Sequence, residues 1–413
     1  MATITRGAEV RPSPGVRGDR ARLWWHEASG SVADLGVLIP IAVALIVANG
    51  LGPTAVLLPA ALAYLVVAVV YRVPVAVQPL KAFGAVAIAA GAGPDVIAAG
   101  SILMGVIFLL LGTGDWINRA AAWFPTPVIR GIQLSVGLLF VKVAWGLATS
   151  PQPAFTDQAP QPALLLTALV LFGLLVILRG RIILVVVVLA IGVAVIAAGS
   201  GLTFGPSAIS MPTLSFDAFA TAAVLLVLPQ LPLTFANSCL APADAARTYF
   251  GDAAERVTPG KLARTLGSTN ILAGAISGMP VCHGAGGMTA HYTFGARTWR
   301  APLLIGSALL VLAIGFGNEL ANVLPAFPLF VLAALLMVAG VAHMMLLRDL
   351  SGTAAWTVAL GVGVIGVLWN LAPAMVIGLV ASAIIQWSAR RLSGASDGDV
   401  GQVEADLSAE AKP

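Results

Sequence analysis

The stretch VPVAVQPLKAFG, residues 73–84, restricts the fold of this chain more than any other segment. It is polar and contains proline, and the small-residue-rich run after it is too short to cross a bilayer. A similar stretch, GMPVCHGAGG at 278–287, precedes a second short run in the other half of the chain. We predict two half-helices, at about 79–92 and 283–294, each preceded by extended backbone. Paired interrupted segments at matching positions of two halves indicate the central site of a transporter.

The composition around these stretches is that of a membrane protein. Of the 413 residues, 59% are hydrophobic and only 10% are charged, whereas a soluble domain has about 25% charged residues. Such a chain can cover its surface with apolar side chains only where the solvent is lipid. The net charge of +4 does not indicate nucleic acid as a partner, because the basic residues are scattered among the loops.

Apolar runs of about 20 residues, the length that a membrane-spanning helix needs, recur in both halves. The predicted full spans lie near 30–49, 53–71, 94–112, 126–147, 162–179, 181–200, 219–241, 260–278, 301–317, 327–347, 351–369 and 371–389. With the half-helices they make about fourteen elements of an all-α polytopic protein, arranged as a seven-plus-seven inverted repeat. We expect one repeat over 26–200 and the other over 201–391, between a disordered basic tail (1–25) and a short acidic tail (392–413).

The distribution of basic residues predicts that both termini are cytoplasmic and that the chain lies in the inner (plasma) membrane. Cytoplasmic loops are enriched in Lys and Arg. The predicted outer loops, near 49–52, 150–161, 201–218, 318–326 and 370–372, contain no Lys or Arg. A topology wrong by one span would reverse every later loop, so this agreement supports the assignment.

Lys81 is the most informative single residue. It follows Gln78 and Pro79 at the predicted start of the first half-helix, close to the middle of the membrane. A cation there costs about 2.5–3.5 kcal/mol and is functional by default. A helix N-terminus adds positive potential and free N–H donors, so this position suits an anion. Alternatively, Lys81 extends to an interface or pairs with Asp34.

The second short stretch offers another helix N-terminus that would face the first. Gly284, Ala285 and Gly286 expose backbone N–H groups and let a ligand approach closely. Together the two termini would bind a tetrahedral oxyanion. His283 would donate to that anion or titrate during transport, unless it is a core histidine with its hydrogen bonds satisfied.

Three further polar residues are candidates for coupling or lining. Asp34, in the first span, is a candidate for carrying a co-transported proton, or is a structural acceptor. Asn237 lies in a span that we expect to be broken by prolines, where an amide contacts substrate or bonds a neighbouring helix. Asp244, near the cytoplasmic end of that span, is a candidate for gating.

Four segments resemble motifs of the molybdate transporter family, a distant branch of the sulfate permease superfamily. They are ADLGVLIPIAVAL (33–45), VPVAVQPLKAFGAVA (73–87), LPQLPLTFANSCLA (228–241) and MPVCHGAGGMTAHYTFGAR (279–297). The family's Gln-Pro-x-Lys falls on Gln78, Pro79 and Lys81, and its His-Gly-Ala-Gly-Gly falls on 283–287. The resemblance implies a core domain that carries the site, a gate domain, and molybdate or sulfate as substrate. A homodimer is the oligomeric state that it suggests. The chain departs from the family at Val37, where a threonine is usual.

These features predict a secondary transporter for a tetrahedral oxyanion, molybdate or else sulfate or tungstate, coupled to protons. Two other functions stay open, a nucleobase permease of the same fold class and an anion channel. We do not expect an enzyme, because no nucleophile–base pair stands at workable spacing. No Walker loop is present, and no cofactor is indicated.

Overall fold

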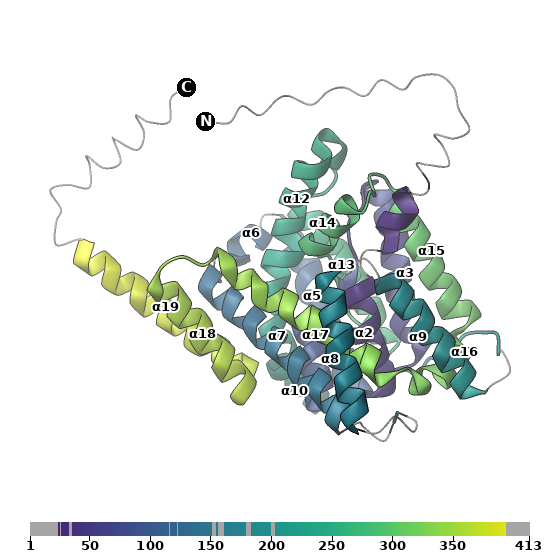
Figure 1. Cartoon of the computed structure of the whole chain (residues 1–413). Helices are drawn as coiled ribbons and strands as arrows, with labels where there is room; N and C mark the ends of the chain where they lie inside the picture. Colours follow the sequence, from purple (N-terminus) through teal and green to yellow (C-terminus); the bar gives the residue numbers. More distant parts are fainter. Residues whose placement is uncertain are drawn as a thin grey trace.

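The computed structural model gives the arrangement of most of the chain as a helical membrane protein (Figure 1). The structure describes residues 24, 26–32, 35–114, 116–121, 123–150, 154–155, 161–178, 183–199 and 203–393. Asp34 and most of the two predicted tails lie outside these residues.

The first half begins with two apolar helices, followed by the predicted half-helix. Its elements are α2 (Leu35–Val47), α3 (Pro53–Val70), strand β1 (Gln78–Pro79), α4 (Lys81–Ala90), α5 (Pro94–Leu111), α6 (Trp116–Ala121), α7 (Thr126–Thr149), α8 (Gln161–Ile177) and α9 (Ile183–Ala198). The half-helix α4 has 10 residues and ends at Gly91, whose φ of 61° is the left-handed conformation that glycine adopts without strain.

Within the described residues, the second half contains ten α-helices and the second strand. They are α10 (Phe216–Ala222), α11 (Leu228–Leu233), α12 (Ala241–Phe250), α13 (Pro259–Ala275), strand β2 (Val281–Cys282), α14 (Ala285–Thr293), α15 (Arg300–Gly315), α16 (Gly317–Val323), α17 (Leu329–Met344), α18 (Thr353–Leu368) and α19 (Leu371–Ser393). The half-helix α14 has 9 residues and, like α4, directly follows a two-residue strand.

The two strands, both buried, form an antiparallel pair. Gln78 lies opposite Cys282, and Pro79 lies opposite Val281. The prolines of this region disfavour helix at the residues before them, which keeps the backbone extended. Asn270 of α13 holds β2 from the side, because its amide accepts from Val281 N at 2.7 Å and donates to Val281 O at 3.0 Å. The strands therefore place the N-termini of α4 and α14 near each other.

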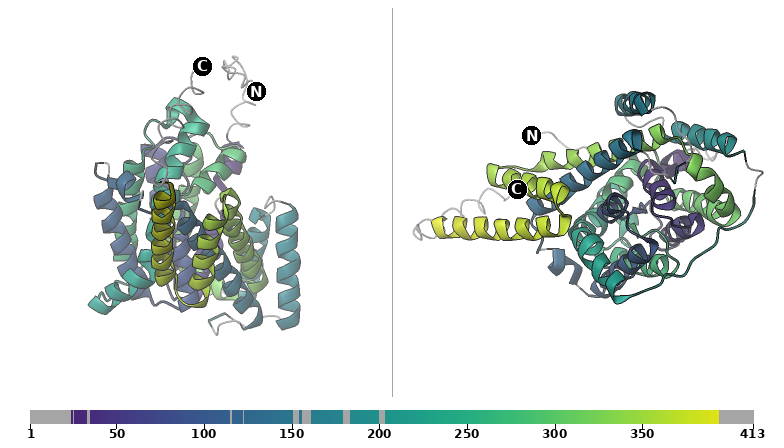
Figure 2. Two further views of the ribbon diagram at one scale, coloured as in Figure 1. Left: turned by 90° about the vertical axis from the view of Figure 1, so that its left-hand side faces the viewer. Right: turned by 90° about the horizontal axis from the view of Figure 1, so that it is seen from below.

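The helices form two groups. In one group, α3 packs on α15 and α5 packs on α13, around α4 and α14. In the other, α7 packs on α17, α18 and α19, and α17 also packs on α8. Figure 1 shows α18 and α19 at the edge of this second group, and in the right-hand view of Figure 2 these yellow-green helices flank a rounded cluster. The groups meet where α4 contacts α7 and α2 contacts α17.

Fewer helices reach full spanning length than the hydropathy predicts. Within the described residues, six helices are long and apolar enough to cross a membrane, or seven if α15 and α16, bent by 78°, count as one span. Helices such as α2, α8 and α18 are apolar but have only 13, 17 and 16 residues. The predicted count of about fourteen crossing elements is therefore not established by helix length.

The expected proline break near Asn237 is wrong. Residues Phe216–Ala254 form one continuous helical span of 39 residues despite Pro229 and Pro232. Two wide π-helical turns, Ala223–Val227 and Thr234–Leu240, stand on either side of these prolines. A π-helical turn re-routes the hydrogen bonds that proline interrupts, so the helix continues instead of breaking.

Candidate functional site

A cavity of about 440 Å³ lies where the two helix groups meet. The half-helices α4 and α14 reach it from one group, and α7 and α17 close it from the other. The lining residues used below are Gln78, Lys81, Arg130, Gln230, Asn237 and His283, together with the backbone of 284–287. Most of the predicted site residues therefore meet in one space.

The N-terminus of α4 carries a charged side chain, and one of its backbone N–H groups already has a side-chain acceptor. Lys81 is the first residue of the helix and lines the cavity half-buried. The backbone N–H of Phe83 donates to Gln230 Oε1 at 3.0 Å, and Gln230 Nε2 donates to Thr234 Oγ1 at 3.0 Å. Gln230 thus fixes the first turn of α4 against the long helix, and the lysine stays available to a ligand.

The N-terminus of α14 presents backbone instead of side chains. Gly284 is the N-cap residue, and no side chain caps this end of the helix. A Cβ on Gly284 would lie 2.3 Å from Gln78 Oε1, so only glycine fits beside that amide. A Cβ on Gly286 would meet no atom within 4 Å, because this residue faces the open cavity. The helix therefore offers the cavity its N–H groups and partial positive charge.

His283 lies in the cavity wall but is bonded away from the open space. Its side chain is buried, and its Nδ1 lies 3.0 Å from Ala76 O. Its Nε2 lies 2.9 Å from Thr265 Oγ1. Both ring nitrogens thus have protein partners, so a direct hydrogen bond to a bound anion would require one of these bonds to break.

The charge balance of the cavity is positive. Lys81 and Arg130 contribute cations, and within the described residues no carboxylate lines the cavity. Arg130, in the first turns of α7, forms an ion pair with Asp349 through Nε (2.8 Å) and Nη2, and its Nη1 donates to Gln133 Oε1 at 2.9 Å. Asp349 follows α17, so this pair ties the ends of α7 and α17 together at the edge of the cavity.

The other predicted residues are placed differently. Asn237 lines the cavity from a π-helical turn, half-buried. Pro79 is buried in β1 and does not line the cavity, and its carbonyl accepts from Cys282 Sγ at 3.4 Å. Asp244 is exposed on α12 and is not among the lining residues. Asp34 lies outside the described residues.

Sequence reasoning missed three residues that shape this site. Arg130 looks like a loop arginine by charge pattern, and Thr265 and Asn270 look like ordinary helix residues. His343 is buried, its Nδ1 lies 2.9 Å from Ala339 O, and it also borders the cavity. Only Asn270 had a detectable signal, as an amide in the middle of a predicted span, where buried polar side chains need partners.

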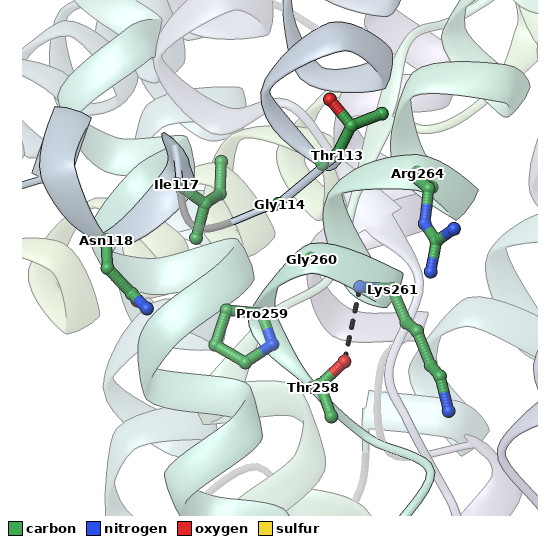
Figure 3. A pocket seen from close by; sticks show the side chains of 10 residues that line it. Thr113, Gly114, Ile117, Asn118, Thr258, Pro259, Gly260, Lys261 and Arg264 are labelled. Carbon is green, nitrogen blue, oxygen red and sulfur yellow. Dashed lines mark hydrogen bonds between the residues drawn. The ribbon is translucent and has the colours of Figure 1, made fainter.

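A second cavity of about 440 Å³ lies apart from the predicted site residues, between the end of α5, α6 and the start of α13. Figure 3 shows Thr258, which precedes α13, bonded to the backbone N–H of Lys261 at 3.4 Å, with Lys261 and Arg264 on the same helix. Within the described part of the chain, no cluster of three or more His, Cys, Asp or Glu residues is suited to hold a metal ion.

Solved structures with the same fold are anion transporters. The transmembrane domain of a cyanobacterial bicarbonate transporter, BicA, superposes with a TM-score of 0.63 at 18% identity, covering 89% of this chain and 98% of that one. The murine anion transporter Slc26a9 in its inward-facing state gives 0.63 at 15% identity, covering 94% and 77%. At these identities the likeness establishes the fold.

Proteins that are similar in sequence identify the family more specifically than the shared fold does. Molybdate transporter 1 of Arabidopsis thaliana is 30% identical over 79% of this chain and 80% of its own length. Molybdate transporter 1 of Chlamydomonas reinhardtii is 29% identical over 88% and 92%. The family model described as "Molybdate transporter of MFS superfamily" matches residues 26–140 and 222–342, which include both half-helices. The resemblance of the four motifs is thereby confirmed, and this multi-pass membrane protein belongs to the molybdate transporter family.

Proposed function

We propose that this chain is a secondary active transporter that moves a tetrahedral oxyanion across the inner membrane together with protons. Molybdate is the first candidate, and sulfate and tungstate share its shape and charge. The names of the relatives and the anion-transporter fold support this assignment. The observation that carries it is the cavity itself, where the N-termini of α4 and α14 meet beside Lys81 with no described carboxylate.

In this proposal Lys81 supplies charge, and the N–H groups of 284–286 supply directed hydrogen bonds. Gln78, packed beside Gly284, and Asn237 complete the polar wall. An oxyanion accepts hydrogen bonds on all of its oxygens, so backbone N–H groups and a lysine satisfy it without a full set of counter-charges. A nucleobase would need an acid or a mixed donor–acceptor set, which this wall does not present within the described residues.

Protons are needed for energetic reasons. An inside-negative potential opposes a dianion by about 2.3 kcal/mol per charge for each 100 mV. Two protons per anion cancel the charge and leave the pH gradient as the driving force, and more than two let the potential contribute. We keep Asp34 and His283 as proton candidates and Asp244 as a gating candidate on the cytoplasmic side.

We propose that the halves 26–200 and 201–391 are inverted repeats related by a pseudo-two-fold axis. Pro125 and Pro328, the N-caps of α7 and α17, are 203 positions apart. Gly137 and Gly340, where each helix meets the carbonyl oxygen of the other, have the same offset. The centres of β1 and β2 also differ by 203 positions. The packing of α5 on α13 is matched by that of α3 on α15, as such an axis requires.

We further propose that both termini are cytoplasmic, as the positive-inside rule predicts. The central cavity is bordered by Arg130 at the start of α7 and by Leu346 after α17, which lie at the cytoplasmic ends of these helices in that topology. The conformation described here would then be open to the cytoplasm. The homodimer that the family resemblance suggests stays a prediction.

Uptake into proteoliposomes tests this proposal. Labelled molybdate is offered with an imposed inward proton gradient, in competition with tungstate, sulfate and uracil. We expect saturable uptake that exceeds the external concentration and is competed by tungstate more strongly than by sulfate. Lys81→Met should weaken anion binding by about 10- to 100-fold, because charged hydrogen bonds contribute about 1.5–3 kcal/mol.

Lys142→Met is the matched control, since Lys142 is also a lysine within a membrane helix but does not line this cavity. Stronger inhibition of molybdate uptake by sulfate than by tungstate would make sulfate the preferred substrate and would leave the proposed mechanism unchanged. Uptake that only equilibrates would identify a channel, and transport of uracil without any oxyanion would overturn the proposal.

A further inference from the structure

A series of partly buried hydrogen bonds leads away from the site at His283. His283 Nε2 lies 2.9 Å from Thr265 Oγ1, and Thr265 Oγ1 lies 2.8 Å from the Tyr71 hydroxyl. The rings of Tyr71 and His283 also meet edge to face, with centroids 6.1 Å apart. Tyr71 caps the end of α3 and Thr265 lies on α13, so residues distant in sequence converge on one imidazole.

The hydrogen bonds from His283 through Thr265 to Tyr71 end at a different cavity. A space of about 430 Å³ lies between α3 and α13, lined by Thr265 and Tyr71 together with Lys261 and Arg264. His283 borders the central cavity and is not among the residues that line this space, which we call the α3–α13 cavity. Thr265, half-buried, therefore lies between the imidazole and a second cavity.

We propose that His283 carries one of the co-transported protons and that Thr265, positioned by Tyr71, passes this proton between His283 and the α3–α13 cavity. Anion and proton would then share a binding region but leave by separate routes. This inference rests on the proposed proton-coupled transport, and it adds the residues and the path.

The geometry accommodates both protonation states of the imidazole. In the neutral ring, Nδ1–H donates to Ala76 O, and Nε2 accepts from the Thr265 hydroxyl. In the protonated ring, Nε2–H donates to Thr265 Oγ1, and the threonine hydrogen turns to Leu262 O, 3.0 Å away. Tyr71 donates to Thr265 in both states. No donor is left unpaired in either state, so titration costs no buried hydrogen bond.

Coupling to the anion follows from the surrounding charges. The titratable or charged side chains that border the two cavities or face these hydrogen bonds, within the described residues, are Lys81, Arg130, His343, Cys282, Cys239, Tyr71, Lys261 and Arg264. None is a carboxylate, so a protonated His283, in a cavity wall shared with Lys81, has no counter-charge while no anion is bound. A bound dianion reverses the sign of this interaction. Protonation and anion binding then favour each other, and by linkage each raises the affinity for the other.

The transfer step is balanced without a co-reactant. The threonine hydroxyl first turns its hydrogen from Leu262 O to a solvent molecule in the α3–α13 cavity. The proton on Nε2 then moves to Thr265 Oγ1 as the threonine's own hydrogen leaves to that solvent. The imidazole becomes neutral, the hydroxyl is regenerated, and one proton has been released. In the proposed topology the ends of α3 and α13 that border this cavity are cytoplasmic, so the path releases protons inward.

Thr265→Val tests the path, because valine keeps the shape and removes the hydroxyl. We expect proton-driven net molybdate uptake to fall about 100-fold, the lower end of the range for losing a positioned proton-transfer group. Molybdate exchange between equal concentrations, which needs no proton release, should stay within about twofold. Thr269→Val is the matched control one turn away, because Thr269 lines the same cavity but its hydroxyl, among the described residues, bonds Thr265 O (2.8 Å) and not His283. Thr265→Ser should restore net uptake.

The outcomes separate this inference from the proposed function. Loss of net uptake with exchange and folding preserved, rescued by serine, supports the path. Wild-type net uptake and proton flux in Thr265→Val would overturn it while leaving coupled transport intact. Wild-type protein that moves molybdate with no proton flux would overturn both. Dependence of coupling on Asp34, with no effect of either Thr265→Val or His283→Gln, would assign the proton to the aspartate.

Discussion

The N-termini of α4 and α14 approach the same cavity from opposite halves, and they differ in how they present positive charge. The α4 terminus has a lysine side chain and a donor capped by Gln230. The α14 terminus has Gly284 and Gly286 and no side-chain cap. The backbone plan is common to both, since each half-helix follows a strand of the central pair.

The difference teaches how one site can combine attraction with discrimination. A lysine is a flexible point charge that attracts any anion. Fixed backbone N–H groups, in contrast, bind most tightly the anion whose size and shape match their positions. Glycine is needed where the backbone must come close, and a side-chain cap is needed where a terminus must be held rigid. We therefore expect affinity to depend mainly on the α4 side and selectivity among oxyanions mainly on the α14 side.

The largest effect on stability should come from removing the cap of α4. Gln230→Met leaves the buried N–H of Phe83 without its acceptor, and an unsatisfied buried donor costs about 1–3 kcal/mol. Thermal unfolding in detergent should show a lowered midpoint. Thr234→Val removes the partner of the Gln230 amide nitrogen and the bond from the Thr234 hydroxyl to Gln230 O, but it leaves the acceptor of the Phe83 N–H in place, so it should lower the midpoint less. Equal effects would mean that the cap does not hold α4.

A smaller effect should distinguish the two glycines of α14. Gly284→Ala places a methyl group on Gln78 Oε1 and displaces that amide from the site, so we expect molybdate affinity to fall about tenfold, or about 1.4 kcal/mol. Gly286→Ala meets no atom and should change affinity much less, while altering the ratio of sulfate to molybdate binding. Titration calorimetry with both anions measures the affinities of these two variants. A larger loss of molybdate affinity in Gly286→Ala than in Gly284→Ala would contradict the roles that we assign to these two glycines.

The smallest effect should come from Arg130, the second cation of the cavity. Asp349→Asn weakens the ion pair of Arg130 and frees its guanidinium for an oxyanion at the edge of the cavity. Molybdate should then bind about two- to fivefold more tightly, a modest gain because half of the Asp349 side chain is exposed. Arg130→Gln should show no such gain. Tighter binding in both variants would exclude the guanidinium as a ligand.

Some features of this protein followed from the sequence alone. The half-helices were predicted at 79–92 and 283–294 and are found at Lys81–Ala90 and Ala285–Thr293. Proline and glycine act on the residues next to them, so a local pattern is enough to place such boundaries. Membrane embedding and the family also followed, because apolar content and short motifs are read directly from the chain.

The tertiary structure alone decided which partners the polar groups have. Arg130 and Asp349 are 219 positions apart, and Tyr71 and Thr265 are 194 apart. Local pattern carries no information on such pairs, since they depend on how α7 meets α17 and α3 meets α13. The same holds for the long helix from Phe216 to Ala254, whose prolines suggested a break that π-helical turns prevent. Boundaries are local and were predictable, whereas hydrogen-bond partners and helix continuity depend on packing between distant segments.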